Sequence, residues 1–353
     1  MSNHSSRTAV SAVLDLSKES LNLGINLSMD PITHTLSGAI LSRTGFYQRF
    51  GRLATIIILV AALIPDIDHF SLRLAGPLAY LKYHRGFTHS IVGSFVIAAV
   101  MAGIAYCTKQ VRERLPQGLR GYGVVFGLSL LGIYTHIFFD LITSYGTQVF
   151  FPFTTKRYSL DLVFIIDLYF TSLLLIPLII IRFKKERAQI IALSSLAGII
   201  AYLGFTCFER STIIEKVKAD NGKLGIKSAR VEAVPLPLSP FRWSVFTEDN
   251  ERFYQTNMDN LSGSSTVEVF QKKTNGNDIT DKVETLDIVK TYLWFARFPV
   301  VSVKQEEGGY LVEYYDIRFN ALPNRKPFLL RLFLDKNGSL KHADLNFHSI
   351  TEK

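Results

Sequence analysis

This sequence has few cysteines and lacks the motif of a serine nucleophile. Its 353 residues contain two cysteines, Cys107 and Cys207, which lie far apart, each inside or beside an apolar stretch. Two such cysteines exclude a disulfide-stapled fold and a cysteine-based zinc ribbon. No Gly-x-Ser-x-Gly motif occurs, and neither cysteine has a histidine near it in sequence. A serine or cysteine nucleophile is therefore not expected.

Acidic residues are scarce in the first part of the chain. Residues 1–208 hold 10 Asp and Glu against 18 Lys and Arg, whereas residues 209–353 hold 20 against 21. The positive charge thus lies in the apolar part of the chain, and together with 48% hydrophobic residues and a mean hydropathy of +0.20 it is typical of a membrane protein. A nucleic-acid-binding domain would place its basic residues on a water-exposed face, so the pI of 9.4 does not indicate a nucleic-acid partner.

Residues 1–28 lack the apolar core and the small-residue cleavage site of a signal peptide. They are rich in Ser and Asn, and we expect a flexible N-terminal extension. The composition changes at Met29, and translation could start at that residue.

Long apolar segments dominate residues 29–208. Five are candidate membrane spans, and a weaker sixth, residues 32–46, is interrupted by His34 and Arg43. They predict an α-helical polytopic membrane domain with five to six membrane helices; the alternative is a set of buried helices in a large soluble protein. The five segments are residues 53–65, 90–107, 121–142, 160–183 and 188–208.

The loops between these segments differ in charge. If residues 32–46 cross the membrane, one side collects eleven Lys and Arg and the other side five, so the richer side is predicted to be cytoplasmic. The C-terminal region would then be extracytoplasmic, and the protein a multi-pass protein of the cell inner membrane. The eleven residues are Arg43, Arg49, Arg52, Lys109, Arg112, Arg114, Arg120, Arg182, Lys184, Lys185 and Arg187.

Residues 209–353 lose the long apolar runs and gain alternation of apolar and polar residues. Strands are expected over 310–319, 328–334 and 340–347, with Asn337-Gly338 as a tight hairpin turn, and one helix over 286–298. This pattern predicts a small β-rich soluble domain over 209–353.

Histidine and aspartate accompany each other in the apolar part. Charged groups in such segments are costly unless they are paired, and imidazole with carboxylate is the ligand set of a hydrolytic zinc, manganese or iron site. With the orientation above, these residues all fall on one membrane face, the outward one. The candidate metal ligands are His34, Asp66, Asp68, His69, His84, His89, His136 and Asp140.

The spacing supports a common site. His136 and Asp140 are four residues apart and share one helical face, where both could bind one metal or Asp140 could orient the His136 ring. Asp66 and Asp68 follow Pro65 at a helix end, where the bend can turn both carboxylates into one pocket. The alternative to metal binding is that single histidines form hydrogen bonds between packed helices. Asp161 and Asp167 are expected to be interfacial or structural.

Four stretches in order resemble a known family: MDPITHTLSGAILSR, LIPDIDHF, GPLAYLKYHRGFTHS and THIFFDLITSYGTQVFFPFTTKRYSLDLVFIIDLYF. They are similar to the YdjM-like, membrane-bound, metal-dependent hydrolases, also described as LexA-binding, inner-membrane-associated hydrolases. The resemblance runs from about residue 29 to 183, and the later SPFRW and DIRF look like the C-terminal part of longer members. It implies a hydrolase that uses a divalent metal at the membrane. A more distant similarity to zinc-dependent phospholipase C and single-strand nucleases points toward phosphoester cleavage.

The leading hypothesis is a membrane hydrolase in which a metal-activated water attacks an ester or phosphoester, derived from lipid or envelope. Asp68 is our choice for the general base, with Asp66 as the second catalytic carboxylate. Arg85, Lys156 and Arg157 are expected to hold a phosphate or lipid head group on the same side, or else to anchor the protein at the lipid surface.

Two other functions use the same residues. One is a non-catalytic, metal-stabilised scaffold whose outward β domain binds a partner. The other is a metal or ion transporter, which would need polar residues at mid-depth in several spans rather than ligands at one face. The sequence leaves open the number and identity of the metals, the substrate and the oligomeric state.

Overall fold

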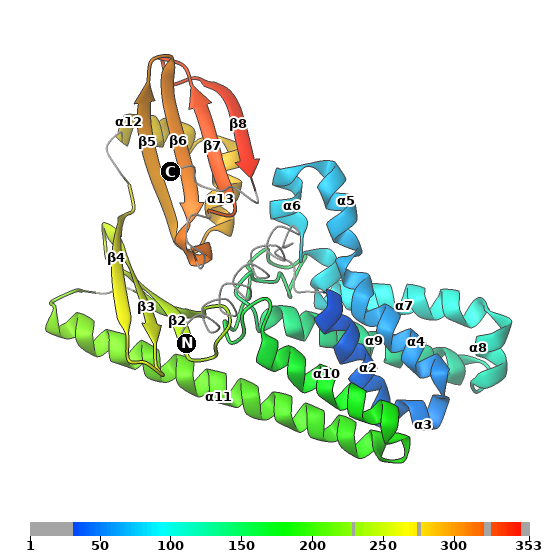
Figure 1. Cartoon of the computed structure of the whole chain (residues 1–353). Helices are drawn as coiled ribbons and strands as arrows, with labels where there is room; N and C mark the ends of the chain where they lie inside the picture. The colour runs from blue at the N-terminus through cyan, green and yellow to red at the C-terminus, as the bar shows by residue number, and fades with distance from the viewer. Residues whose placement is uncertain (1–30, 228–229, 274–276, 321–325, 347–353) are drawn as a thin grey trace, which may run out of the picture.

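The computed structural model describes residues 31–227, 230–273, 277–320 and 326–346. A bundle of helices is followed by one long helix, α11, and by two β-sheets (Figure 1). The expected extension over residues 1–28, and Asp30 after it, lie outside these residues. The prediction of a helical membrane region followed by a β-rich region is confirmed.

The helical region begins at Pro31 and ends at Lys223. Short 3-10 helices (η) interrupt it at the points where candidate site residues occur. In chain order the elements are α2 Pro31–Arg43, α3 Phe46–Phe50, α4 Arg52–Leu63, η1 Ile64–Asp66, α5 Ile67–Ala75, α6 Pro77–Tyr83, η2 Phe87–His89, α7 Ile91–Cys107, α8 Lys109–Arg114, α9 Leu119–Leu141, α10 Leu168–Phe183, η3 Lys185–Arg187 and α11 Ala188–Lys223.

The predicted count of five to six membrane helices is too high. Within the described residues three helices are long and apolar enough to span a bilayer, and a fourth span results if the pair Pro77–His89 and Ile91–Cys107, bent by 65°, counts as one. At about 1.5 Å per residue, the 16 residues of α10 and the 13 of α2 fall short of the roughly 30 Å hydrocarbon core. The three helices are Arg52–Leu72, Leu119–Leu141 and Lys185–Lys223.

Helix α9 packs closely against α4 because of a glycine. A Cβ atom on Gly132 would lie 2.7 Å from both the Ala61 Cβ and the Ile58 carbonyl oxygen, so only glycine allows this approach. Small residues serve the same purpose between membrane helices in general. Gly132 lies one helical turn before His136, and α4 leads into Asp66. The close contact therefore brings two predicted ligands together.

The two ends of the helical bundle differ in chemistry. Asp66, His89 and Asp140 lie where α4, α7 and α9 end or begin near the sheets, whereas α3, α8 and the turn between α10 and α11 lie at the far end (Figure 1). That far end carries the eleven Lys and Arg described above. The predicted separation of the site from the basic loops is thus present in the fold.

In its described residues, the C-terminal region contains two four-stranded antiparallel sheets. The strands expected over 310–319, 328–334 and 340–347 correspond to β6, β7 and β8, and the helix expected over 286–298 is the shorter α13. Tyr292 and Phe295 of α13 pack on Val312 and Leu330 of the second sheet. The elements are β1 Arg230–Pro235, β2 Arg242–Glu248, β3 Arg252–Asp259, β4 Ser265–Gln271, α12 Asn277–Val283, α13 Asp287–Phe295, β5 Pro299–Glu306, β6 Gly309–Asp316, η4 Ile317–Phe319, β7 Leu329–Leu334 and β8 Leu340–Asn346.

Helix α11 connects the two regions without a break. It continues past the predicted boundary at residue 208, and Ile213 and Val217 near its end pack on Trp243 and Val245 of β2. Its earlier turns expose large apolar side chains, as the lipid-facing side of a membrane helix does: Ile190, Leu193 and Ile200. The first sheet is therefore mounted directly on a membrane span.

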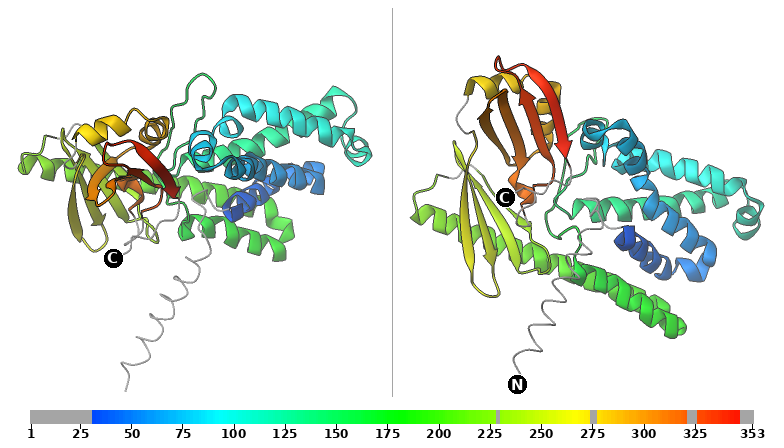
Figure 2. Two further views of the ribbon diagram at one scale, coloured as in Figure 1. Left: turned by 90° about the horizontal axis from the view of Figure 1, so that it is seen from above. Right: turned by 45° about the horizontal axis from the view of Figure 1, so that its top comes forward.

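The loop between α9 and α10 lies between the helical bundle and the sheets (Figure 2). Arg297 reaches from the C-terminal region to both carboxylate oxygens of Asp161, at 2.8 and 3.0 Å, and also contacts Glu232. Burial alone would raise the pKa of Asp161, but the Arg297 guanidinium holds it below its usual value. Asp167 caps α10 by accepting a hydrogen bond from the Phe170 backbone at 2.9 Å. Both aspartates thus make structural contacts.

Candidate metal centre

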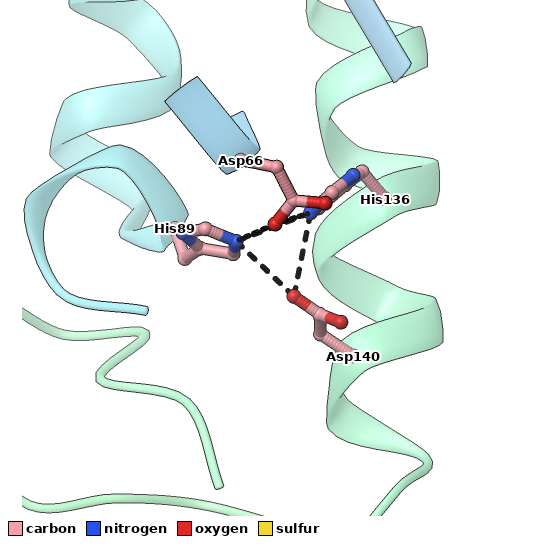
Figure 3. A group of neighbouring side chains, drawn as sticks. All are labelled: Asp66, His89, His136 and Asp140. Atoms are coloured by element: carbon pink, nitrogen blue, oxygen red, sulfur yellow. Dashed lines mark hydrogen bonds and ion pairs between the residues drawn. The ribbon is translucent and has the colours of Figure 1, made fainter. Parts of the chain in front are cut away.

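Four side chains converge at the sheet-facing end of the helical bundle (Figure 3). Asp66 comes from η1 after α4, His89 from η2 before α7, and His136 and Asp140 from successive turns of α9. One ligand atom from each lies within 4.8 Å of the other three. We call these four residues the cage. The sequence already showed that His136 and Asp140 are one helical turn apart, and the fold brings Asp66 and His89 to them.

The distances within the cage fit a small divalent cation. The two Nε2 atoms of His89 and His136 are 3.1 Å apart, and each lies 3.5 Å from Asp66 Oδ1. Asp140 Oδ2 lies 3.2 Å from the His89 nitrogen and 3.4 Å from the His136 nitrogen. Ligands about 2.0 to 2.1 Å from a tetrahedral zinc are separated by about 3.3 to 3.4 Å. The five separations given above are close to this ligand–ligand spacing.

Hydrogen bonds fix which nitrogen of each histidine faces the cage. His136 donates from Nδ1 to the carbonyl oxygen of Ala62 at 2.7 Å. The Thr88 hydroxyl donates to Asp68 at 2.7 Å, so it accepts from Nδ1 of His89 at 2.9 Å. A neutral imidazole that carries its proton on Nδ1 presents a lone pair on Nε2.

Two nitrogen lone pairs therefore face each other at 3.1 Å, with two carboxylate oxygens beside them. Four electron-rich atoms in a buried space repel one another unless a positive charge lies among them. A metal ion supplies that charge, and without one a proton on an imidazole serves the same purpose. The donor set and its outer hydrogen bonds fit a divalent metal site.

The cage is closed on most sides. His89, His136 and Asp140 are buried, whereas the Asp66 side chain keeps 17% of its surface exposed. Access from solvent is therefore at Asp66. A catalytic metal site needs such an opening, because a water or the substrate occupies one coordination position of the metal, while a structural site is enclosed.

Arg85 lies inside the protein next to the cage. Its Nη2 pairs with Asp140 Oδ1 at 2.8 Å, and its Nη1 donates to the Asp140 carbonyl and to Thr143. One Asp140 oxygen thus faces the arginine and the other faces the cage. The Arg85 guanidinium is thus buried against Asp140, and its role in binding substrate stays a prediction.

Asp68 also lies next to the cage. Its Oδ1 lies 2.9 Å from Nδ1 of His84, and its Oδ2 accepts from the Arg85 backbone and from the Thr88 hydroxyl. Both carboxylate oxygens are engaged in hydrogen bonds away from the cage. Asp68 therefore contacts His89 through Thr88, and its predicted roles as ligand and general base stay predictions.

Three other predicted ligands lie around the cage rather than in it. The His34 ring stacks on His136 at a centroid distance of 3.8 Å, and its Nε2 lies 3.6 Å from Asp140 Oδ1. Nδ1 of His69 lies 2.8 Å from the Tyr80 hydroxyl. His84 bonds Asp68, as described. The fold thus brings four of the eight predicted ligands into one group and places His34 directly against it.

Lys156 and Arg157 lie farther away, in the loop between α9 and α10. Lys156 is exposed, and Arg157 donates to the carbonyl oxygens of Gly146, Leu81 and His84.

The role of Thr88 was not predicted from the sequence. A hydroxyl residue directly before His89 is nevertheless a signal of a side chain that orients a ligand.

Comparisons with known proteins identify a family. A family model described as YdjM inner membrane protein matches residues 29–213, which include every cage residue. The chain is 30% identical over 142 residues to an uncharacterized protein, YfhP, of Bacillus subtilis (strain 168), a match that covers 38% of this chain and 41% of that relative. The chain thus matches less than half the length of that relative. No solved structure matches the chain.

Proposed function

Because the chain belongs to the YdjM inner membrane protein family, and because four buried donors converge at one end of its membrane helices, we propose that it is a membrane-bound, metal-dependent hydrolase. The observation that carries the proposal is the pair of Nε2 lone pairs held 3.1 Å apart beside two carboxylates. Imidazole and carboxylate without thiolate favour zinc, with manganese or iron as alternatives.

Each residue of the site has a distinct task. A divalent cation held by the cage would supply a water activated for attack on an ester or phosphoester. Asp66, the cage residue open to solvent, is the base that takes up the proton of the attacking water, and His89, His136 and Asp140 are the three metal ligands, so that the fourth coordination position is left to the water. Arg85 holds Asp140 turned toward the cage, and the pair of Asp68 and Thr88 holds the His89 ring in its tautomer.

The purified protein, reconstituted in turn with zinc, manganese and iron, tests the proposal. We expect hydrolysis of a phosphodiester or a phospholipid within a panel that also contains phosphomonoesters, carboxylic esters and amides. A chelator should abolish the activity, and the same metal should restore it. If the metal-loaded protein cleaves nothing in the panel and still binds an envelope component through residues 209–353, the scaffold function replaces the hydrolase.

Asp68→Asn separates orientation of a ligand from ligation. The amide keeps the size of the side chain but weakens the hydrogen bond that fixes Thr88, so we expect metal affinity or activity to fall about 10- to 100-fold. Metal titration of the purified variant measures the change. Asp287→Asn, an exposed change in α13, is the matched control and should behave as wild type. Complete loss of metal would place Asp68 among the ligands.

The orientation in the membrane is a further part of the proposal. The basic end of the bundle is placed in the cytoplasm, and the cage with the C-terminal region outside it. Alkaline phosphatase fused after Gly225, beyond the end of α11, should be active, and the same fusion after Lys185, between α10 and α11, inactive. The reverse pattern would contradict both the orientation and the outward position of the site.

A further inference from the structure

A second cavity lies between the α9–α10 loop and the C-terminal sheets. Its volume is about 630 Å³, which is the size of a site for a small organic ligand. Residues of the loop, of β1 and of α13 share its wall, so neither the helical region nor the sheets would form it alone. The wall includes Tyr145, Lys156, Arg157, Trp294 and Arg318.

The wall of this cavity is strongly cationic. It carries one lysine and four arginines against Glu232. Arg297 is neutralised by Asp161, and Arg318 pairs with Asp316 at 3.1 Å. Lys156 and Arg157 form no ion pair with a carboxylate in the part of the chain that the structure describes. The cavity therefore retains positive charge that no side chain of the described protein offsets.

Arg157 is the central cation of this wall. Its guanidinium carbon lies 5.1 Å from the centroid of the Tyr145 ring and 5.2 Å from that of Trp294. Its Nε is buried without a hydrogen-bond partner. Burial, together with the nearby charges of Arg85 and Arg318, lowers the pKa of Arg157 to about 10. A cation in such surroundings is costly, and a bound anion would offset that cost.

Two further donors lack partners at the same wall. The hydroxyl of Tyr145, whose side chain is 1% exposed, is buried without a hydrogen bond, and so is Nε of Arg318. Buried polar groups are nearly always hydrogen-bonded in proteins. Three residues of this wall thus each carry a buried donor without a hydrogen-bond partner, which an acceptor with several oxygens would satisfy.

We propose that this cavity binds the phosphate group of a ligand, with Lys156 and Arg157 as the counter-charges and Arg318 and Tyr145 as further donors. A phosphate has enough oxygens for all four residues, whereas a carboxylate has two. Trp294 provides an apolar face for the part of the ligand that carries the phosphate. The C-terminal region thereby contributes half of the binding site.

Residues of the cavity wall also contact two neighbours of the cage, His84 and Arg85. Arg157 donates to the backbone of His84 at 3.0 Å, and the Arg85 guanidinium carbon lies 5.0 Å from the same Tyr145 ring. Arg85 in turn pairs with Asp140. The assignment of the bound phosphate to the hydrolase's own substrate rests on the function proposed above, whereas the binding of phosphate does not.

Tryptophan fluorescence provides the test. The chain has two tryptophans: Trp243 is buried in the sheet core, whereas Trp294 is 36% exposed at the cavity. The full-length protein, purified in detergent and freed of metal with a chelator, is titrated with inorganic phosphate and with dihexanoyl phosphatidic acid. We expect a saturable change that Trp294→Phe abolishes. Tighter binding of the lipid would indicate a head group, and equal binding a free phosphate.

Substitutions make the test specific. Loss of one charge-assisted hydrogen bond corresponds to roughly 10- to 100-fold weaker binding, which we expect for Arg157→Gln. Lys156→Gln, at an exposed residue, and Tyr145→Phe should weaken binding by a smaller factor and remain informative if Arg157→Gln does not fold. Arg242→Gln, an exposed change in β2, is the matched control.

Three results would overturn the proposal: no saturable response to either probe, unchanged affinity in Lys156→Gln and Tyr145→Phe, or equal binding of acetate. Because the protein is free of metal, none of them depends on hydrolysis. Failure of this proposal is thus distinguishable from failure of the hydrolase proposal.

Discussion

His136→Ala is expected to purify from the membrane without its metal. The side chain provides one of two imidazoles in the cage. Because its Nδ1 donates a hydrogen bond to the Ala62 carbonyl oxygen, its Nε2 faces the cage. Loss of a ligand should cost more metal affinity than the roughly 10- to 100-fold typical of an outer residue. Elemental analysis of wild type and variant, at equal protein concentration, measures the difference.

Two other histidines make this result interpretable. His69→Ala changes a residue that lies near the cage but bonds Tyr80, and His342→Ala changes an exposed residue of β8. Both variants should keep their metal. If His69→Ala loses it as completely as His136→Ala does, the cage as drawn in Figure 3 is not the metal site. Unchanged metal in His136→Ala, with lower expression, would favour a helix-packing role.

Arg85→Ala is expected to destabilise the protein by about 3 to 5 kcal/mol, the usual cost of removing one partner of a buried ion pair. Arg85 is fully buried, and its loss would leave Asp140 Oδ1 without the positive charge that lies 2.8 Å away. Chemical unfolding of the detergent-purified protein, followed by circular dichroism, measures the effect. Arg242→Ala, at an exposed position, serves as the control.

A double substitution tests the cause. If the uncompensated carboxylate is responsible, Asp140→Asn should restore part of the stability in the Arg85→Ala background. Equal stability of the single and double variants would show instead that the arginine acts through packing. Asp140→Asn also removes a cage carboxylate, so the comparison is made with metal-free protein.

Much of this site could be predicted from the sequence, because histidines and aspartates in apolar segments have few other uses. What the sequence could not show is which of them meet. Asp66 and Asp68 are two residues apart, but the 3-10 turn of η1 directs one into the cage and the other toward His84. Only the close packing at Gly132 brings α4 near enough to α9 for Asp66 to join His136.

The fold was predictable to a similar degree. Alternating residues and the Asn337-Gly338 turn indicated the strands of the second sheet, and apolar length indicated the long helices. The number of spans was overestimated because apolar composition does not reveal where a helix ends. The break at η2 and the short length of α10 are set by local geometry that hydropathy does not contain.

Helix α11 gives the protein a mechanical property. Its 36 residues form a rod about 54 Å long that starts in the apolar bundle and carries the first sheet on its last turns. Membrane helices tilt when the thickness of the bilayer changes. A rod without a hinge transmits that tilt to the sheet, while Asp161 and Arg297 tether the same sheets to the α9–α10 loop. A change in bilayer thickness would thereby act on the contact between Asp161 and Arg297.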